Sequence, residues 1–480
     1  MANMNWAGKR VVILGLARQG MALARYFAGQ GARVVVSDAK PADKLAAELA
    51  GLSDWPIDFV LGGHPPTMLD SADLLCLSGG VPADVPPAQE ARRRGVPVTN
   101  DSQIFLDAAP CPVVGITGSA GKTTTTALVG RILKAEGGRM KDESQPSSFI
   151  THPSVWVGGN IGNPLIADLP QMEAGDLAVM ELSSFQLEIM TTSPHIAGVL
   201  NITPNHLDRH GTMAAYIEAK SHVVRYQRPG DIAVLGWDDD NARKLADAAP
   251  GLVWWFTSRG DVPLGTLVRD GDIFLRDGRR EQKVGPVSHI KLRGAHNVLN
   301  VLAACALAGA AGAPPDVMRG VFSSFDGVAH RLEFVREVNG VKWYNDSIAT
   351  APERVTAALH SFSEPLVLLA GGRDKKLPWD ELMVLARQRV RKLVVFGEAA
   401  DLIAEAAEAE NMKVESRRYK MAPKFLEVVK CATLAEAVQK AGELARPGDV
   451  VLLSPGCTSY DAYKDFVERG EKFREMVIAL

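Results

Sequence analysis

The stretch Val113-Val-Gly-Ile-Thr-Gly-Ser-Ala-Gly-Lys-Thr-Thr124 runs from an apolar strand through a glycine-rich turn into a helix. Glycines let the backbone wrap around a phosphate with several N–H groups, and the positive end of the helix points at the same place. Lys122 can reach the terminal phosphates of a nucleotide, and the Thr123 hydroxyl can hold Mg²⁺. The stretch therefore predicts ATP binding at the carboxyl end of a strand.

The glycine spacing of this loop differs from the usual phosphate-loop pattern. That pattern is Gly-x₄-Gly-Lys-[Ser/Thr], and Ile116 stands where its first glycine should be. The loop reads Gly115-x₂-Gly118-x₂-Gly121-Lys122 instead. A chance glycine turn before a helix is the alternative, and the Lys-Thr pair placed correctly after a strand argues against it.

Strand and helix patterns alternate along almost the whole chain on both sides of the loop. This alternation is typical of βα units and mostly parallel sheets. We predict strands at residues 11–14, 33–37, 74–77, 113–117, 155–157, 177–180, 196–201, 232–235, 341–344, 366–369, 393–396 and 450–453, and a helix that begins near Pro352. The expected fold class is α/β with three domains: Rossmann-like at 1–110, central and P-loop ATPase-like at 111–327, and Rossmann-like again at 328–480.

Composition limits the class of protein. The 480 residues carry a formal net charge of −3, which gives no basic field to hold a nucleic acid. The most apolar stretch, residues 298–312, is shorter than the ~20 residues of a membrane span and predicts a buried helix. The five cysteines form no Cys-x-x-Cys pair, and no secretory signal is visible. We expect a cytoplasmic monomer that acts on small molecules and has neither a membrane nor a nucleic-acid partner.

A second glycine motif follows the first predicted strand. Gly15-Leu-Ala-Arg-Gln-Gly20, together with Asp38 at the end of the next strand, superficially fits a dinucleotide fingerprint. Ala17 replaces the middle glycine and hinders close approach of a pyrophosphate. A nicotinamide-dependent oxidoreductase would also leave Lys122 and Glu181 unexplained, so this interpretation is weaker than ATP-dependent chemistry.

Three more polar residues follow the strands of the middle segment. Glu181 lies at the end of an apolar strand, at the edge where ligands of parallel sheets bind. His206 lies just past the next strand, and Lys220 lies in a pattern that indicates an exposed helical lysine. A solvated carboxylate, a structural histidine and a surface lysine are the alternatives to functional roles here.

The shifted glycine spacing resembles that of the Mur ligase family, and the resemblance extends over nearly the whole chain. The matching blocks are Glu181-Leu-Ser-Ser-Phe-Gln-Leu-Glu188, Asn201-Ile-Thr-Pro-Asn-His-Leu-Asp208, Gly294-Ala-His-Asn-Val-Leu-Asn300, His330-Arg331, Asn345-Asp-Ser347, Leu453-Ser-Pro-Gly-Cys-Thr-Ser-Tyr-Asp461 and Lys464-Asp-Phe-Val-Glu-Arg-Gly470. The Ser-Ser-Phe-Gln-Leu-Glu and Ser-Pro-Gly-Cys blocks are most similar to the branch of the family that adds D-glutamate.

The resemblance implies an ATP-dependent amide ligase of peptidoglycan precursor synthesis, and thus of cell shape and division. A carboxylate of UDP-N-acetylmuramoyl-L-alanine would attack the γ-phosphate of ATP, and the amine of D-glutamate would then displace phosphate from the acyl phosphate. Both steps gather negative charge, so the site should supply Mg²⁺, here two ions, and cations. The resemblance also implies that CO₂ forms a metal-binding carbamate on Lys220, which requires a depressed lysine pKa.

Residue by residue, the resemblance implies a set of contacts for each ligand. Catalytic roles belong to Lys122, Glu181, His206, Lys220 and Arg331, and metal binding to Thr123, Glu181, His206 and the Lys220 carbamate. ATP contacts belong to Gly115, Thr117, Gly118, Ser119, Ala120, Gly121, Lys122, Thr123, Thr124, Asn297, His330, Arg331 and Asp346. The UDP substrate is assigned Leu16, Ala17, Arg18, Asp38, Lys40 and Asn160. The amino acid is assigned Thr350, Lys375, Ser459 and Phe466, with Lys376 as an alternative to Lys375.

The sequence departs from the family pattern in a few places. Ile348 stands where a lysine is common, so one cation near the transferred phosphate is missing, and compensation by Arg373 or Lys376 is a hypothesis. Ser78-Gly-Gly-Val81 replaces a more usual Ser-Pro-Gly, and a polar, turn-rich surface loop is expected at 137–148.

Other interpretations stay open at this point. The chain could add L-glutamate or another amino acid, since residue types do not reveal stereochemistry. A folylpolyglutamate-type ligase shares the ATP core but would lack a separate UDP-binding domain. A non-catalytic nucleotide-binding scaffold would not need Lys122, Glu181, His206 and Lys220 together.

Overall fold

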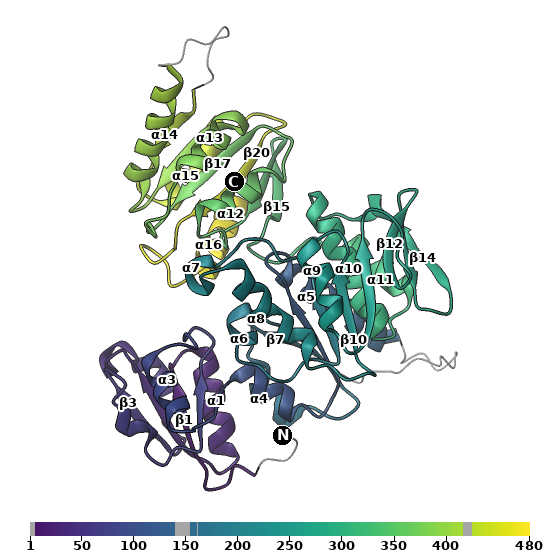
Figure 1. Ribbon diagram of the computed structural model, residues 1–480. Helices are drawn as coiled ribbons and strands as arrows, with labels where there is room; N and C mark the ends of the chain where they lie inside the picture. The colour runs from purple at the N-terminus through teal and green to yellow at the C-terminus, as the bar shows by residue number, and fades with distance from the viewer. Residues whose placement is uncertain (1–4, 140–153, 161, 416–424) are drawn as a thin grey trace. The chain divides into compact units, whose positions relative to one another are not determined.

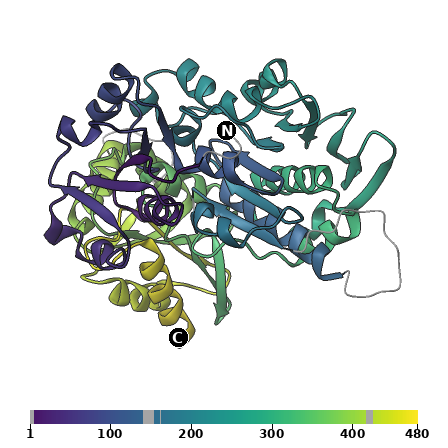
Figure 2. The same cartoon turned by 90° about the horizontal axis from the view of Figure 1, so that it is seen from below.

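The computed structural model describes residues 5–139, 154–160, 162–415 and 425–480, which form three α/β domains in chain order (Figures 1 and 2). One compact unit comprises the described residues up to Ile290 together with His296–Ser324, and a second comprises Lys291–Ala295 and Phe325–Leu480. The α/β fold class with mostly parallel sheets is therefore confirmed. No helix of the described residues is long and apolar enough to cross a membrane.

The N-terminal domain is built on a five-stranded, all-parallel sheet of order β3-β2-β1-β4-β5. Its strands are β1 (Arg10–Leu14), β2 (Arg33–Asp38), β3 (Ile57–Leu61), β4 (Leu74–Leu77) and β5 (Val98–Asn100), and its helices are α1 (Arg18–Gly29), α2 (Ala46–Ala50), α3 (Pro86–Arg93) and α4 (Asp101–Ala108). The apolar run of β1 is completely buried because strands flank it on both sides. The strand order reverses between β1 and β4, which marks the place where a ligand binds in such sheets.

The central domain is built on a nine-stranded sheet of order β14-β13-β12-β11-β10-β9-β6-β8-β7. Its strands are β6 (Val113–Thr117), β7 (Val155–Gly159), β8 (Leu177–Glu181), β9 (Ile196–Val199), β10 (Ile232–Gly236), β11 (Leu252–Thr257), β12 (Gly265–Arg269), β13 (Asp272–Arg276) and β14 (Glu281–Pro286). Its helices are α5 (Lys122–Arg139), α6 (Ser184–Leu187), α7 (Leu207–His210), α8 (Met213–Arg225), α9 (Asp240–Lys244), α10 (Ala295–Ala310) and α11 (Pro315–Ser324). The strands from β7 to β12 are parallel, and only β12-β13-β14 pair antiparallel.

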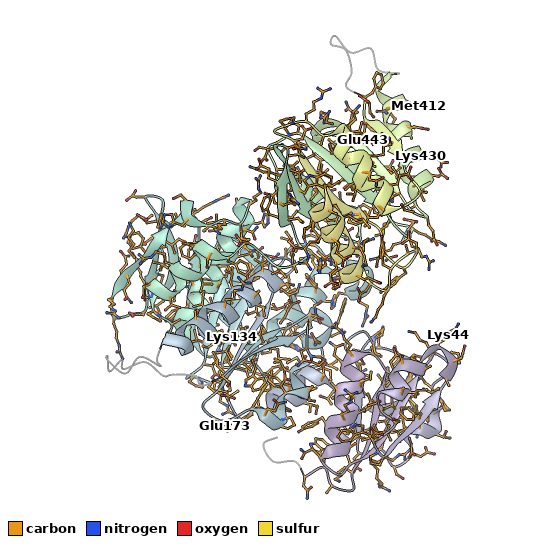
Figure 3. All side chains as sticks on the ribbon, turned by 180° about the vertical axis from the view of Figure 1, so that it is seen from behind. Lys44, Lys134, Glu173, Met412, Lys430 and Glu443 are labelled. Carbon is orange, nitrogen blue, oxygen red and sulfur yellow. The ribbon has the colours of Figure 1, made fainter. Side chains whose placement is uncertain are left out.

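The C-terminal domain is built on a six-stranded sheet of order β15-β16-β20-β17-β18-β19. Its strands are β15 (Glu333–Val338), β16 (Val341–Asn345), β17 (Leu366–Gly371), β18 (Val390–Phe396), β19 (Glu427–Lys430) and β20 (Val450–Gly456). Its helices are α12 (Pro352–Leu359), α13 (Asp380–Arg389), α14 (Ala400–Glu415), α15 (Leu434–Leu444) and α16 (Phe466–Ala479). Strands β16, β20, β17 and β18 are buried and parallel, whereas Met412, Lys430 and Glu443 point outward from the domain (Figure 3).

Most of the predicted strands are confirmed, and the errors have identifiable causes. The strand predicted at 196–201 ends two residues earlier, because Leu200 and Asn201 already turn toward the phosphate loop. Strands β3, β5, β11, β12, β13, β14, β15 and β19 were missed. None of them is buried over its whole length, and most carry at least one charged residue, so they lack the continuous apolar runs of the central strands. The turn Asp270-Gly271, with φ of +52° and +79°, is the hairpin signal that could have revealed β12 and β13.

Two other predictions concern single segments. The buried helix expected at 298–312 is confirmed as α10, which begins three residues earlier. The polar loop expected at 137–148 is wrong for its first three residues, because α5 continues to Arg139. The rest of that loop lies outside the described residues.

Candidate active site

The phosphate loop lies where the central sheet reverses its strand order. Strand β6 is flanked by β8 on one side and β9 on the other, and both are parallel to it. Ligands of open α/β sheets bind outside the carboxyl ends of the strands at such a point. The loop at 118–121 leaves β6 there, and helix α5 begins directly after it at Lys122.

Hydrogen bonds from the end of the neighbouring strand hold the loop in shape. The backbone N–H groups of Ser119 and Ala120 donate to the main-chain and side-chain oxygens of Asn201, each at 2.9 Å. Gly121 has a φ of +86°, and a Cβ there would overlap the side chain of Asn300 in α10. The loop is therefore preformed and needs glycine at this position. Two of the expected ATP contacts, Ser119 and Ala120, direct their N–H groups to Asn201.

Glu181 contacts two other expected site residues at the end of β8. Its carboxylate is buried and accepts a hydrogen bond from Thr123 Oγ1 at 2.9 Å. The other carboxylate oxygen accepts from Asn160 Nδ2 at 3.1 Å. Asn160, which the sequence assigned to the UDP substrate, thus lies beside the expected metal ligands. A solvated strand-end carboxylate is excluded for Glu181, since only 1% of the residue is exposed.

Lys220 is completely buried in α8, so the surface lysine that its sequence pattern indicates is wrong. Its Nζ donates to Thr117 Oγ1 and to the Gly118 carbonyl, each at 3.1 Å. Burial holds the pKa of this amine well below its ordinary value, and the nearby charge of Lys122 acts in the same direction. Lys122 itself donates from Nζ to the Gly118 carbonyl at 2.9 Å. Two lysines therefore share one carbonyl of the phosphate loop, one of them biased toward the neutral amine.

His206 is held beside the start of α6 by aromatic packing. It has a left-handed φ of +52° at the start of α7, and its exposed ring meets the Phe185 ring edge-on at 5.1 Å. Phe185 also stacks on His210 at 5.3 Å. Helix α6 is fixed by a capping box in which Ser183 and Gln186 each accept from the other's backbone N–H. The histidine therefore lies next to the helix that follows Glu181 in the chain.

These residues fit one Mg²⁺ ion that a bound nucleotide would complete. No group of three His, Cys, Asp or Glu side chains suited to a metal occurs in the part of the chain that the structure describes. Mg²⁺ needs no such cage, because it is usually bound by one or two carboxylates together with phosphate oxygens and water. The Thr123 hydroxyl and the Glu181 carboxylate supply hard oxygen donors next to the phosphate loop.

The residues expected to contact the adenosine part of ATP come from both units. Asn297 belongs to the first unit, where its side-chain oxygen accepts from Asn300 Nδ2 at 2.8 Å. Asp346 belongs to the second, where its carboxylate accepts from Ser454 Oγ at 2.8 Å and from the Leu332 N–H at 3.3 Å. Burial raises the pKa of Asp346 to about 7.

His330 and Arg331 lie in the C-terminal unit near Asp346. His330 is buried with a φ of +63°, and its Nδ1 lies 3.1 Å from the amide nitrogen of Asn345. A Cβ on Gly470 would overlap its ring, and burial lowers its pKa. The imidazole is therefore packed inside its own domain, and Arg331 follows it at the isolated bridge with Val328.

The four residues assigned to the amino acid lie at one edge of the C-terminal sheet. Strand β20 is placed between β16 and β17, so the loops after these three parallel strands are adjacent. Lys375 Nζ donates to Thr350 Oγ1 at 3.1 Å, which joins the loop after β17 to the loop after β16. Ser347 Oγ donates to the Phe466 carbonyl at 2.8 Å, and the buried Ser459 follows β20.

A buried arginine ties these loops together. Arg469 in α16 is fully buried, and its guanidinium donates to Ser347 O at 2.8 Å and to Cys457 O at 3.2 Å. Its pKa is lowered to about 10 by burial. Sequence reasoning singled out the block around Phe466 but gave Arg469 no role, because a buried arginine cannot be told from an exposed one by its neighbours in the chain.

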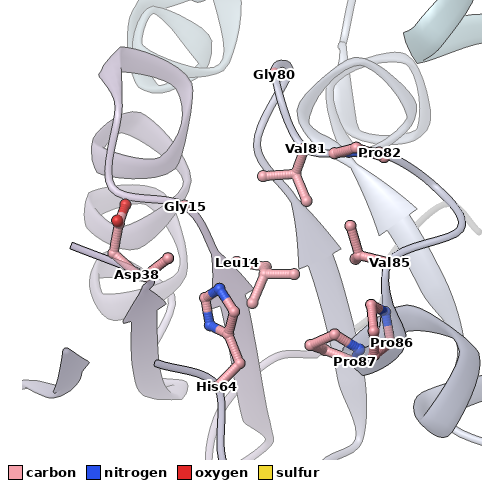
Figure 4. A pocket seen from close by; sticks show the side chains of 11 residues that line it. Leu14, Gly15, Asp38, His64, Gly80, Val81, Pro82, Val85, Pro86 and Pro87 are labelled. Carbon is pink, nitrogen blue, oxygen red and sulfur yellow. The ribbon is translucent and has the colours of Figure 1, made fainter. Parts of the chain in front are cut away.

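The N-terminal domain contains a cavity of about 500 Å³ at the reversal between β1 and β4 (Figure 4). Its lining residues are Leu14, Gly15, Asp38, Ala39, His64, Gly80, Val81, Pro82, Val85, Pro86 and Pro87. A nucleobase-sized ligand fits such a mostly apolar pocket with a few polar groups.

Only one of the residues assigned to the UDP substrate in this domain lines the cavity. Asp38 does so, and its carboxylate also accepts from the N–H groups of Leu16 and Lys40 at 2.8 and 2.9 Å. Arg18 instead donates to the Gly162 carbonyl at 2.9 Å. Gly80 and Val81 belong to the departure noted at residues 78–81. The lining at 82–87 was missed, because its place beside β1 depends on a strand order that the sequence does not reveal. The run of glycine and prolines after β4 was the available signal.

Comparisons with known proteins cover almost the whole chain. Residues 9–100 match the Mur ligase MurD-like N-terminal domain, residues 116–308 the Mur ligase middle domain, and residues 330–457 the glutamate ligase domain of Mur ligases. The UDP-N-acetylmuramoylalanine–D-glutamate ligase of Symbiobacterium thermophilum is 42% identical over 98% of both chains. The enzyme of the same name from Pelotomaculum thermopropionicum is 41% identical over 98% of both.

Solved structures share the fold at much lower sequence identity. The UDP-N-acetylmuramate–alanine ligase of Thermotoga maritima is 19% identical, with a TM-score of 0.55 over 98% of this chain and 99% of that one. A MurF structure from Acinetobacter baumannii is 18% identical, with a TM-score of 0.56 over 97% and 93% of the two chains. From its three matched domains and its full-length relatives, the chain belongs to the Mur ligase family.

Proposed function

We propose that this protein joins D-glutamate to UDP-N-acetylmuramoyl-L-alanine, at the expense of ATP, through an acyl-phosphate intermediate. The observation that carries this proposal is the cluster on the phosphate loop, where Lys122, the Thr123–Glu181 pair and the buried Lys220 converge. Such a cluster places cations and metal ligands around a transferred phosphate but offers no covalent nucleophile. The names of the full-length relatives support the choice of substrates.

The chain's own groups have distinct tasks in this reaction. Lys122 and the N–H groups at the start of α5 bind the phosphates of ATP. Thr123 and Glu181 hold Mg²⁺, which neutralises charge on the phosphates when bound. His206 and a carbamate on Lys220 would hold a second ion, and Arg331 would support the transferred phosphate with its planar guanidinium.

The carbamate follows from the state of the Lys220 amine. A neutral amine attacks CO₂, forms an N–C bond and releases one proton, which leaves a carboxylate. An ordinary lysine is almost entirely protonated near neutral pH, and each unit by which its pKa falls raises the neutral fraction about tenfold. The lowered pKa of Lys220 therefore favours the modification, and the new carboxylate would be aimed at the phosphate loop.

The substrates are assigned to the sheet edges described above. The cavity at the β1–β4 reversal takes the UDP part of the sugar nucleotide, with Asp38 fixing the loops at Leu16 and Lys40. D-Glutamate binds at the edge of the C-terminal sheet through Lys375, Thr350, Ser459 and the main chain near Phe466. We assign Lys375 and not Lys376 to this site, because Lys375 contacts Thr350.

Other properties are part of the same proposal. The domain limits 1–110, 111–327 and 328–480 are supported by three sheets that each lie within one range. We infer that the protein is a cytoplasmic monomer of peptidoglycan precursor synthesis. Gel filtration with light scattering tests the monomer, and a dimer mass would contradict it.

The proposed reaction is tested by phosphate release from ATP with UDP-N-acetylmuramoyl-L-alanine as the acceptor. D-Glutamate, L-glutamate, D-aspartate, L-lysine and no amino acid are compared in parallel, with Lys122→Ala as the inactive control. Release stimulated by D-glutamate alone and abolished in the variant is the expected result. Stimulation by a different amino acid would support the mechanism but would assign that amino acid as the substrate. No release with any of them refutes the proposal and favours a folylpolyglutamate-type ligase or a scaffold.

A further inference from the structure

Three cationic side chains gather at the carboxyl edge of the C-terminal sheet, and one of them is neutralised. Arg373 forms two hydrogen bonds with the Glu398 carboxylate, at 2.8 and 2.9 Å. Because this pair occupies its guanidinium, Arg373 is a poor candidate for the cation that Ile348 does not supply. The other two cations are Lys375 and Arg354.

Neither Lys375 nor Arg354 forms an ion pair within the described residues. Lys375 has the Thr350 hydroxyl as its partner, at 3.1 Å. Arg354 has the Ile348 carbonyl, at 3.4 Å from Nη1. Both side chains are exposed, so each could have extended into solvent. They turn instead toward the loop after β16, where Thr350 is assigned to the amino acid.

The position of Arg354 follows from the start of α12. Pro352 occupies the first turn of this helix, and Arg354 lies two residues later with its guanidinium directed back to the carbonyl of Ile348. Partial desolvation lowers the pKa of Lys375, and the charge of Arg354 acts in the same direction. Two cations directed to the same loop form a site that an anion with two negative groups would neutralise.

We propose that Arg354 binds a carboxylate of the acceptor amino acid and thereby makes the site selective for a dicarboxylic substrate. Lys375 and Thr350 bind one carboxylate, and the Arg354 guanidinium binds the other in the bidentate manner that suits its planar fork. This inference rests on the proposed function, and it adds a specificity-determining residue from α12.

The test compares Arg354→Gln and Arg354→Lys with the wild type. We expect the KM for D-glutamate to rise about 10- to 100-fold in Arg354→Gln, the range of a lost charge-assisted hydrogen bond. The KM values for ATP and for the UDP substrate should stay within about twofold. Arg354→Lys keeps the charge but loses the planar guanidinium, so its KM for D-glutamate should lie between those of the wild type and Arg354→Gln. The preference for D-glutamate over D-glutamine should narrow in Arg354→Gln.

Two neighbours provide matched controls. Arg373→Gln removes a cation from the same edge that is already paired with Glu398, and it should change the KM for D-glutamate less than about twofold. Glu353→Gln removes the adjacent negative charge on α12, and it should lower that KM by a small factor. An effect of Arg354→Gln no larger than that of Arg373→Gln would overturn the proposal. A rise in the KM for ATP alone would also overturn it, because the arginine would then act on phosphate.

Binding measured without turnover separates this inference from the proposed function. Saturable binding of D-glutamate to the full-length protein is followed by calorimetry, with D-norvaline as a ligand that lacks the second carboxylate. Binding without any phosphate release would contradict the proposed function, and weaker binding in Arg354→Gln would still support the inference. Wild-type protein that binds both amino acids equally, or neither, would refute the role of Arg354.

Discussion

Replacing Lys220 by methionine removes a buried amine but keeps most of the alkyl chain that carries it. The amine makes hydrogen bonds to Thr117 Oγ1 and to the Gly118 carbonyl, and it lies 4.8 Å from the centre of the Tyr216 ring. Methionine has a similar length and flexibility, so the variant should fold with little loss of packing. We expect phosphate release to fall at least about 100-fold, because the carbamate proposed as a ligand of a second metal ion cannot form.

The same substitution has a signature in stability that does not depend on activity. The pKa of Lys220 is lowered in the folded protein from its ordinary value of 10.5. At a pH between the lowered pKa of the folded protein and 10.5, the unfolded chain binds a proton that the folded chain does not, so the stability of the wild type rises with pH. The slope is about 1.4 kcal/mol per pH unit for one group. The variant lacks this contribution.

Calorimetry in CO₂-free buffer over the pH range immediately below 10.5 measures the difference. For a domain of this size, a stability change of 1 kcal/mol shifts the melting temperature by roughly 2–4 °C. The difference in melting temperature between the wild type and Lys220→Met should therefore change by about 3–6 °C per pH unit, in favour of the wild type as pH rises. Lys134→Met provides the control, because this lysine lies on the exposed face of α5 and its amine stays in water (Figure 3). Parallel curves for the wild type and Lys220→Met would refute a neutral buried amine.

Three further outcomes follow from single side chains. Asp38→Ala should raise the KM for the UDP substrate about tenfold and leave the KM for ATP unchanged in steady-state assays, because the carboxylate holds two backbone N–H groups beside the cavity. The stability of Asp346→Asn relative to the wild type should rise as pH rises from 3.8 to about 7 and stay constant above that. The raised pKa means that ionisation of the buried carboxyl destabilises the folded wild type over this range. A difference in stability that does not change with pH in calorimetry would contradict this. Gly115→Ala should lose at least about 2 kcal/mol in chemical unfolding, because the new Cβ would overlap the ring of Pro194; a loss within about 0.5 kcal/mol would show that β6 can shift there.

Local features of the sequence were sufficient to predict the phosphate loop and its surroundings. A strand followed by a glycine turn, Lys122 and a helix predicts a phosphate loop from neighbouring residues alone. Glu181 ends a continuous apolar strand, and this apolar run predicts that the strand is buried. Both predictions rest on residues close together in the chain. The helix start at Pro352 was equally local, since the missing N–H of proline suits the first turn.

Features that depend on strand order or on tertiary burial could not be predicted in this way. Lys220 has the helical neighbours of a surface residue, and only the packing of α8 against the phosphate loop buries it. The lining of the N-terminal cavity comes largely from the loop after β4, which lies beside β1 only because the sheet reverses there. Arg354 was missed for a different reason, because an arginine in the first turn of a helix gives no sign in the sequence of whether it extends into solvent or turns back to the Ile348 carbonyl.

The fate of the substrate's carboxylate oxygens tests the central claim most directly. UDP-N-acetylmuramoyl-L-alanine labelled with ¹⁸O in its free carboxylate is incubated with ATP, Mg²⁺ and D-glutamate, and the released phosphate is analysed by mass spectrometry. Attack of that carboxylate on the γ-phosphate predicts one ¹⁸O atom in each phosphate and the other in the new amide. Phosphate without label would mean that water attacks ATP, or that the carboxylate is activated in another way, and would contradict the acyl-phosphate mechanism.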